Sequence, residues 1–285
     1  MSSVIGPPLH SRSLGAQVSR LLLPVYTALA VGYLFLPIAV MMIFSFNNPR
    51  GRQNITWQGF TIENYFDVWH RPDITGPMTS SLVVAVVATL AATVLGTLIG
   101  LALTRYEFRG RGPLNLLIYV PMATPEVIMG ASLLSLWVSA GVQRGLLTIV
   151  IAHIMFNISY VVVTVRARIA GFNRSLEEAA MDLGADEWTT FRKVTLPLIF
   201  PGILAAAMLA FALSIDDYVI TVFVSGQTRT FPLWVYGASR FGVPPEVNVL
   251  GTLIFVVAFV LIVAQLLWAR RRRSIEVALS REVAG

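Results

Sequence analysis

Residues 174–198, RSLEEAAMDLGADEWTTFRKVTLPL, form a largely polar segment between two long apolar stretches. Ser175 and Glu178 are three residues apart, which is the spacing of a capping box and predicts that a helix begins there. Four apolar residues at i, i+3, i+4 and i+7 give that helix one apolar stripe: Leu176, Ala179, Ala180 and Leu183. Gly184 then predicts the end of the helix, because glycine adopts the left-handed conformation without a β-carbon clash.

A second short helix is expected after the glycine, presenting Trp188 and Phe191 before Pro197 leads into the next apolar stretch. The segment is therefore predicted to be two short amphipathic helices hinged at Gly184. Their small apolar face has acidic flanks, which suit an anionic membrane surface poorly. A groove in a partner protein is the better expectation.

The surrounding sequence predicts an all-α polytopic membrane protein. Hydrophobic residues make up 56% of the chain and charged residues only 13%, where soluble domains have about 25% charged residues. Stretches of about 20 apolar residues are long enough to cross a bilayer as helices. Six transmembrane helices are predicted, at about 21–46, 78–103, 114–140, 146–165, 201–224 and 247–268. The third of these is interrupted by Pro121, Pro125 and Glu126.

These spans divide the chain into a tail at 1–20, a membrane domain at 21–268 and a second tail at 269–285. An even number of spans places both termini on one side. If that side is cytoplasmic, internal segments carry 15 of the 21 basic residues, in agreement with the positive-inside rule. The loop at 166–200 is then cytoplasmic as well. The same rule accounts for the net charge of +6, so we expect no nucleic-acid partner.

Composition also limits the chemistry that the chain can perform. It has no cysteine and three scattered histidines, so neither a metal site nor a catalytic residue is predicted. His153 lies within a span and is expected to be a hydrogen-bonded packing residue. Lys193 is the only lysine, and no phosphate-binding loop accompanies it, so energy from ATP would have to come from a partner.

Three acidic residues fall inside the predicted spans: Glu126 beside Pro121 and Pro125, and the neighbours Asp216 and Asp217. A charge at the centre of a transmembrane helix costs about 2.5–3.5 kcal/mol on insertion scales. We therefore expect these carboxylates to face a water-filled path, and to favour a cation there. The alternative is that one or more of them cap or hydrogen-bond neighbouring helices.

The segment at 174–198 closely resembles the signature loop of bacterial ABC-importer permeases. The motif is EAA, three residues, glycine, nine residues and I-x-L-P; here Val194 replaces the isoleucine. The resemblance implies a six-helix permease of the type I (MetI-like) fold, whose loop docks on a cytoplasmic ATPase. The residues that carry over to this coupling role are Glu178, Ala179, Ala180, Gly184, Leu196 and Pro197.

Further stretches resemble the spermidine/putrescine type of permease, among them YVPMATPEVIMGASLL (119–134), AFALSIDDYVITVFVSG (210–226) and RFGVPPEVN (240–248). The resemblance implies a bacterial inner-membrane subunit paired with a second, homologous permease. It also implies two copies of an ATPase that binds ATP and Mg²⁺, and an extracytoplasmic binding protein. A polyamine suits the acids through ion pairing and nearby aromatic rings through cation–π contact.

Other functions remain open at this point. Related permeases share the signature loop, so iron, thiamine or another small solute are alternative substrates. An ion-coupled transporter would use the acids for protons or sodium but would leave the signature loop without a purpose. An aspartyl protease needs two carboxylates face to face, which neighbours on one helix do not provide.

Overall fold

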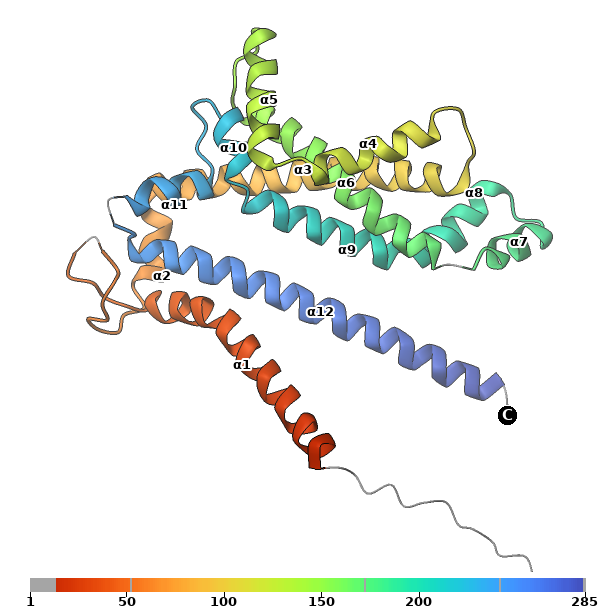
Figure 1. Cartoon of the computed structure of the whole chain (residues 1–285), viewed down its shortest axis with the longest axis horizontal. Helices are drawn as coiled ribbons and strands as arrows, with labels where there is room; N and C mark the ends of the chain where they lie inside the picture. The colour runs from red at the N-terminus through yellow and green to blue at the C-terminus, as the bar shows by residue number, and fades with distance from the viewer. Residues whose placement is uncertain (1–13, 52, 172, 241, 284–285) are drawn as a thin grey trace, which may run out of the picture. The chain divides into compact units, whose positions relative to one another are not determined.

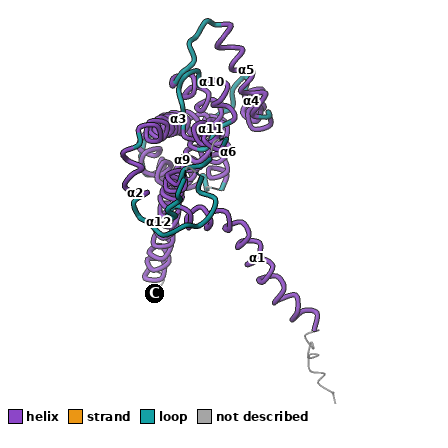
Figure 2. Tube along the Cα trace, turned by 90° about the vertical axis from the view of Figure 1, so that its left-hand side faces the viewer, coloured by secondary structure: helices purple, strands orange, loops and turns teal. Residues whose placement is uncertain are grey.

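The computed structural model describes residues 14–51, 53–171, 173–240 and 242–283. These residues form helices joined by loops (Figures 1 and 2). The chain divides into two compact units, residues 1–68 with 242–285, and residues 69–241, and each is described by itself.

The core of the second unit is a bundle of α3 (Pro72–Arg105), α6 (Leu146–Ala170) and α9 (Leu196–Ile215). Small residues line the contacts between these helices. A β-carbon added at Gly96 on α3 would lie 2.7 Å from Val161 on α6. The GTLIG pattern at 96–100 therefore lets two backbones approach closely, as such patterns do in membranes.

The predicted third span is not one straight helix. It divides into α4 (Arg111–Ala123) and α5 (Glu126–Ser139), which are bent by 107°. The interruption predicted within 114–140 is therefore confirmed at Pro125 and Glu126, whereas helix α4 continues through Pro121. Thr124 is extended because the ring of Pro125 disfavours a helical conformation at the preceding residue. At about 1.5 Å per residue each half is roughly 20 Å long, short of the ~30 Å hydrocarbon core.

The predicted fifth span at 201–224 is also interrupted. α9 ends at Ile215, residues 216–218 are not helical, and α10 (Val219–Val224) follows. α11 (Phe231–Ser239) completes this part of the chain. The two aspartates thus lie at a break between helices and not on one continuous helix.

The signature loop contains α7 (Ser175–Asp182), α8 (Glu187–Thr190) and a short π-helix, η2 (Phe191–Thr195), that leads into α9. The predicted helix start at Ser175 is confirmed, and Gly184 has the expected positive φ of 85°. The predicted capping box is wrong. The backbone N–H of Ser175 donates instead to Asn173 Oδ1, at 3.1 Å, because that amide side chain already reaches the first turn.

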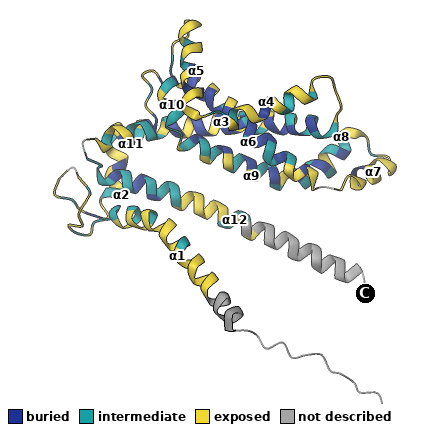
Figure 3. Cartoon of the chain, in the orientation of Figure 1, coloured by how far each residue is buried: buried dark blue, intermediate teal, exposed yellow. Residues whose placement is uncertain are grey.

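The other unit contains α1 (Leu14–Phe44), α2 (Asn64–Asp67) and α12 (Pro245–Val283), with the short 3-10 helix η1 (Val68–His70) following α2 in the chain. α1 and α12 approach closely at Gly251, where an added β-carbon would lie 2.6 Å from Met41 Sδ. α1 is exposed along most of its described length (Figure 3).

The two predicted tails are helical where they are described, and their place outside the membrane stays a prediction. Residues 14–20 already belong to α1, and α12 continues through the predicted tail as far as Val283. The remaining tail residues, 1–13 and 284–285, lie outside the described part of the chain.

Five helices of the described residues are long and apolar enough to cross a membrane, and six if the bent α4–α5 pair counts as one span. The chain is accordingly a multi-pass, all-α membrane protein. The predicted number of six is reached only with a broken third span.

Candidate functional site

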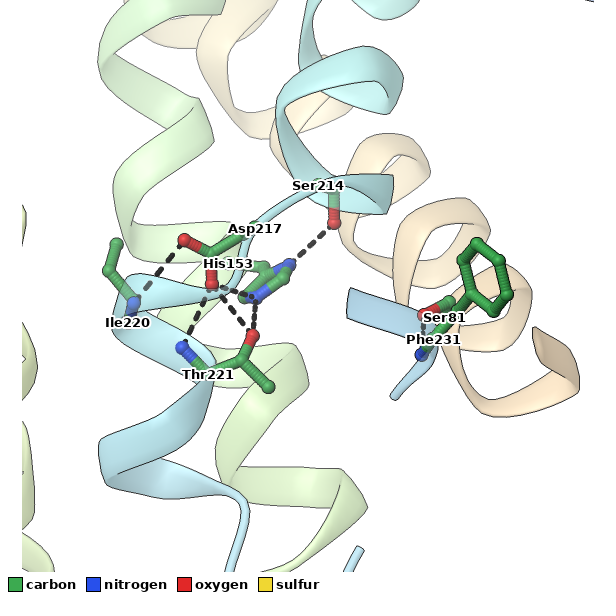
Figure 4. A network of polar contacts seen from close by, with 7 residues as sticks. All are labelled: Ser81, His153, Ser214, Asp217, Ile220, Thr221 and Phe231. Atoms are coloured by element: carbon green, nitrogen blue, oxygen red, sulfur yellow. Dashed lines mark hydrogen bonds and ion pairs between the residues drawn. The ribbon is translucent and has the colours of Figure 1, made fainter. Parts of the chain in front are cut away.

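The break between α9 and α10 separates two neighbouring carboxylates into different environments. Asp216 is exposed, whereas the side chain of Asp217 is only 8% exposed. Figure 4 shows Asp217 directed toward α6 and the start of α10. The structure therefore gives these two acids different physical roles.

Asp217 caps α10. Its Oδ2 accepts hydrogen bonds from the backbone N–H of Thr221, at 2.8 Å, and from Thr221 Oγ1, at 2.7 Å. Its Oδ1 accepts from the backbone N–H of Ile220, at 3.3 Å. Because the first N–H groups of a helix have no intrahelical partner, a carboxylate at this position satisfies them.

His153 of α6 joins this cap to the end of α9 (Figure 4). Its Nε2 lies 3.0 Å from Thr221 Oγ1 and 3.3 Å from Asp217 Oδ2. Its Nδ1 lies 2.6 Å from Ser214 Oγ. Both ring nitrogens of this buried histidine are thus partnered, which confirms the prediction of a hydrogen-bonded packing residue. The network fixes three helices at the break.

Glu126 lies at the break of the third span. It is the first residue of α5 and is exposed, so it is not in the middle of a helix, and its place on a water-filled path stays a prediction. The bend at Pro125 ends one helix and starts another, which places the carboxylate in a first turn, where the helix dipole favours negative charge. It is not part of the network around Asp217.

Two tyrosines and an arginine follow Asp216 and were missed from the sequence. The ring of Tyr218 lies 4.7 Å from that of Tyr236 on α11, between centroids. The guanidinium carbon of Arg240 lies 5.2 Å from the centroid of the Tyr236 ring. A cation held over an aromatic face is stabilised by the ring quadrupole. The cation on the Tyr236 ring is Arg240 of this chain, and Tyr218 is two residues after the exposed Asp216 in the sequence.

The signature loop exposes large apolar side chains. Exposed fractions are 49% for Leu176, 89% for Leu183 and 66% for Trp188, whose ring stacks on Phe191. Figure 3 shows α7 as largely exposed. The predicted apolar stripe therefore exists and is uncovered within the described chain. Such a surface is expected where a partner binds.

The remaining motif residues occupy both ends of this loop. Glu178 and Ala179 are exposed on α7, and Glu178 lies 3.7 Å from Arg174. Ala180 is half-buried, and Leu196 and Pro197 form the start of α9. Asp186 caps α8 by accepting from the N–H of Thr189, at 3.1 Å, and hydrogen bonding to Thr189 lowers the pKa of Asp186.

One residue of α7 points inward and was also missed. Glu177 is 8% exposed and forms a two-pronged ion pair with Arg105, the last residue of α3, in which Nη2 and Oε1 are 2.6 Å apart. Thr195 of η2 donates its hydroxyl to the same Oε1. No sequence signal separates Glu177 from Glu178, because the two partners of Glu177 lie 72 and 18 residues away from it along the chain.

The loop and the aspartates lie at opposite ends of the α3–α6–α9 bundle, as Figure 1 shows for α7 and α10. α9 connects the two directly: it begins after η2 and ends before Asp216. Its 20 residues give a separation of about 30 Å.

Residues 92–274 match the family described as the binding-protein-dependent transport system inner membrane component. The chain belongs to this family. Its members are permease subunits of ABC transporters and are not themselves enzymes. The match spans most of the second unit and part of α12.

The similar proteins of this family include two from Escherichia coli K12. The spermidine/putrescine transport system permease protein PotC is 39% identical over 254 residues, covering 89% of this chain and 96% of PotC. The putrescine transport system permease protein PotI is 38% identical over 250 residues, covering 85% of this chain and 88% of PotI.

Solved structures of the same fold come from ABC importers. One is a bacterial ABC transporter involved in alginate import, with 16% identity, a TM-score of 0.65 and coverage of 90% of this chain and 98% of that one. Another is the MetNI methionine transporter, with 17% identity, a TM-score of 0.55 and coverage of 70% and 93%. The predicted MetI-like permease fold is thereby confirmed.

Proposed function

We propose that this chain is the membrane subunit of an ATP-driven importer and forms half of the path for a polyamine. The observation that carries the proposal is the exposed Asp216 carboxylate, two residues before Tyr218, whose ring contacts Tyr236, at the bundle end opposite the coupling loop. Carboxylate and aromatic faces together suit a chain of ammonium groups on an apolar stem. PotC and PotI, by their names, transport spermidine and putrescine, which supports the same class.

In this proposal Asp216 and Asp217 have different roles. Asp216 faces the path and supplies negative charge to the cation, and Glu126 adds a second exposed carboxylate. Asp217 has its oxygens occupied by Thr221 and Ile220, so it holds the break in shape. Its part in transport is then to position Asp216 and Tyr218.

The loop at 166–200 receives the movement that ATP binding and hydrolysis produce in the partner ATPases. Its exposed Leu176, Leu183 and Trp188 would enter a cleft of a cytoplasmic ATPase, two copies of which bind ATP and Mg²⁺. Glu178, Ala179, Ala180 and Gly184 form the docking helix and its end, and Leu196 and Pro197 join it to α9. Closure of the ATPases would displace the loop, and α9 would change the side to which the path opens.

Charge supports a cytoplasmic position for the loop. Within residues 69–241, eight basic residues lie at the loop end of the bundle and four at the end that carries the aspartates. By the positive-inside rule the loop end faces the cytoplasm, as would both termini of the membrane domain at 21–268. An extracytoplasmic binding protein would then deliver the polyamine at the acidic end, and a second permease would complete the path in a bacterial inner membrane.

Complementation of transport tests this function. Cells lacking the chain, and lacking other polyamine importers, should regain uptake of labelled spermidine or putrescine when it is restored. Uptake of labelled iron and thiamine, measured in the same cells, should not change. Restored iron or thiamine uptake with no polyamine uptake would overturn the substrate and leave the family assignment intact.

A further inference from the structure

Glu177 is the inward-facing acid of a helix that otherwise exposes its side chains. Its neighbour Glu178 is 61% exposed by side chain, whereas the Glu177 side chain is 10% exposed and that of Arg105 is 18% exposed. Glu177 contacts α3 through Arg105 and the π-helix η2 through Thr195. One carboxylate therefore joins three elements that are separate in the sequence.

The geometry of this contact is that of a fixed link. The guanidinium of Arg105 donates through two nitrogens to the two carboxylate oxygens, a planar arrangement that permits little rotation. The pair is largely buried, where loss of one partner leaves an uncompensated charge. Arg105 also ends α3, where the helix dipole favours a cation.

The loop would be loosely attached to the bundle without this link. Residues 183–186 separate α7 from α8, and the hinge at Gly184 has open space around the position of a β-carbon. η2 is a π-helix, a form that occurs mostly as single turns and frequently at functional sites. Thr195 places the Glu177 contact on the last residue of this turn, immediately before α9.

We propose that Glu177 is a positioning residue that clamps the coupling loop to α3 and to the start of α9, so that loop displacement moves those helices. The inference rests on the proposed coupling role of the loop. Without the clamp, the loop moves by changes in backbone conformation at Gly184 and η2, and α3 and α9 do not move with it. ATP hydrolysis then continues while transport per ATP falls.

The test uses the complete importer, with ATPase and binding protein, in proteoliposomes. Uptake of labelled spermidine and ATP hydrolysis are measured in the same vesicles for Glu177→Gln, Arg105→Gln and the double variant. Each single change should lower spermidine carried per ATP by on the order of tenfold, a usual size for coupling between sites. The double variant should be no worse than either single one, because both remove the same link.

Glu107→Gln is the matched control. Glu107 pairs with Arg111 at the same end of α3, at 3.7 Å, but is 95% exposed by side chain, and such surface pairs contribute little. It should keep wild-type transport per ATP.

If Glu177→Gln or Arg105→Gln does not assemble, Arg105→Lys is measured, because lysine keeps the positive charge and cannot donate through two nitrogens to both carboxylate oxygens. Wild-type transport per ATP in an assembled variant overturns the clamp.

A cross-linking experiment between the loop and the ATPase tests the docking role of the loop separately from the clamp. The chain has no cysteine, so Leu183→Cys carries a single photoreactive probe. Cross-linking to the ATPase together with unchanged transport per ATP in Glu177→Gln overturns the clamp alone. Absence of cross-linking in the wild-type background overturns the docking role of the loop, and the clamp with it.

Discussion

Asp216→Asn lowers spermidine uptake by about 10- to 150-fold, because a hydrogen bond to a charged group is worth about 1.5–3 kcal/mol. The substitution keeps the size of the side chain and removes the charge that would attract an ammonium group. Asp216 is exposed, so folding does not depend on that charge. The amount of protein in the membrane should therefore stay unchanged while initial uptake of labelled spermidine falls.

Asp73→Asn is the matched control for this result. Asp73 is also an exposed aspartate at the same end of the bundle, in the first turn of α3, but it pairs with Arg71 at 3.0 Å. Its substitution should leave uptake within about twofold of wild type, since exposed pairs contribute only about 0–1 kcal/mol. Equal losses in both variants would mean that negative charge acts generally at this end, and not through Asp216.

Asp217→Ala destabilises the protein, in contrast to Asp216→Asn, which lowers uptake without changing the amount of protein. It removes the cap of α10 and leaves the buried N–H groups of Ile220 and Thr221, and the ring of His153, with fewer partners. Loss of a cap and of buried hydrogen bonds costs about 2–5 kcal/mol together. The thermal midpoint of the detergent-purified chain should fall, and membrane abundance and uptake should fall in parallel.

Asp216→Ala serves as the control at the neighbouring position. It should keep the thermal midpoint of the wild type, because its side chain is exposed. Asp217→Asn should lie between Asp217→Ala and wild type, since its amide oxygen still accepts one hydrogen bond. A stable Asp217→Ala protein that fails only in transport would refute the structural role given to Asp217.

Local sequence signals predicted much of this fold. Long apolar stretches gave the helices, and Gly184 gave the hinge at its positive φ, because both depend on residues that are neighbours in the chain. The interruption of the third span was predicted at Pro121, Pro125 and Glu126, because proline disturbs a helix locally. The break at residues 216–218 was not predicted, although a pair of charges marks it, because the apolar composition of 201–224 resembles one continuous span.

The polar networks could not be predicted in the same way. His153 meets Ser214 and Thr221 across 61 and 68 residues, and Glu177 meets Arg105 across 72. Such pairs depend on how helices pack, which hydropathy does not specify. The signature motif drew attention to Glu178, while packing selected Glu177 as the buried acid.

Reconstitution of transport tests the central claim most directly. The complete importer in proteoliposomes is supplied with ATP on the side of its ATPases, and ionophores collapse the proton and sodium gradients. The account predicts that uptake of labelled spermidine requires ATP, survives the ionophores and falls with Asp216→Asn. Uptake that continues without ATP and disappears with the ionophores would contradict it, since the acids would then serve an ion-coupled transporter.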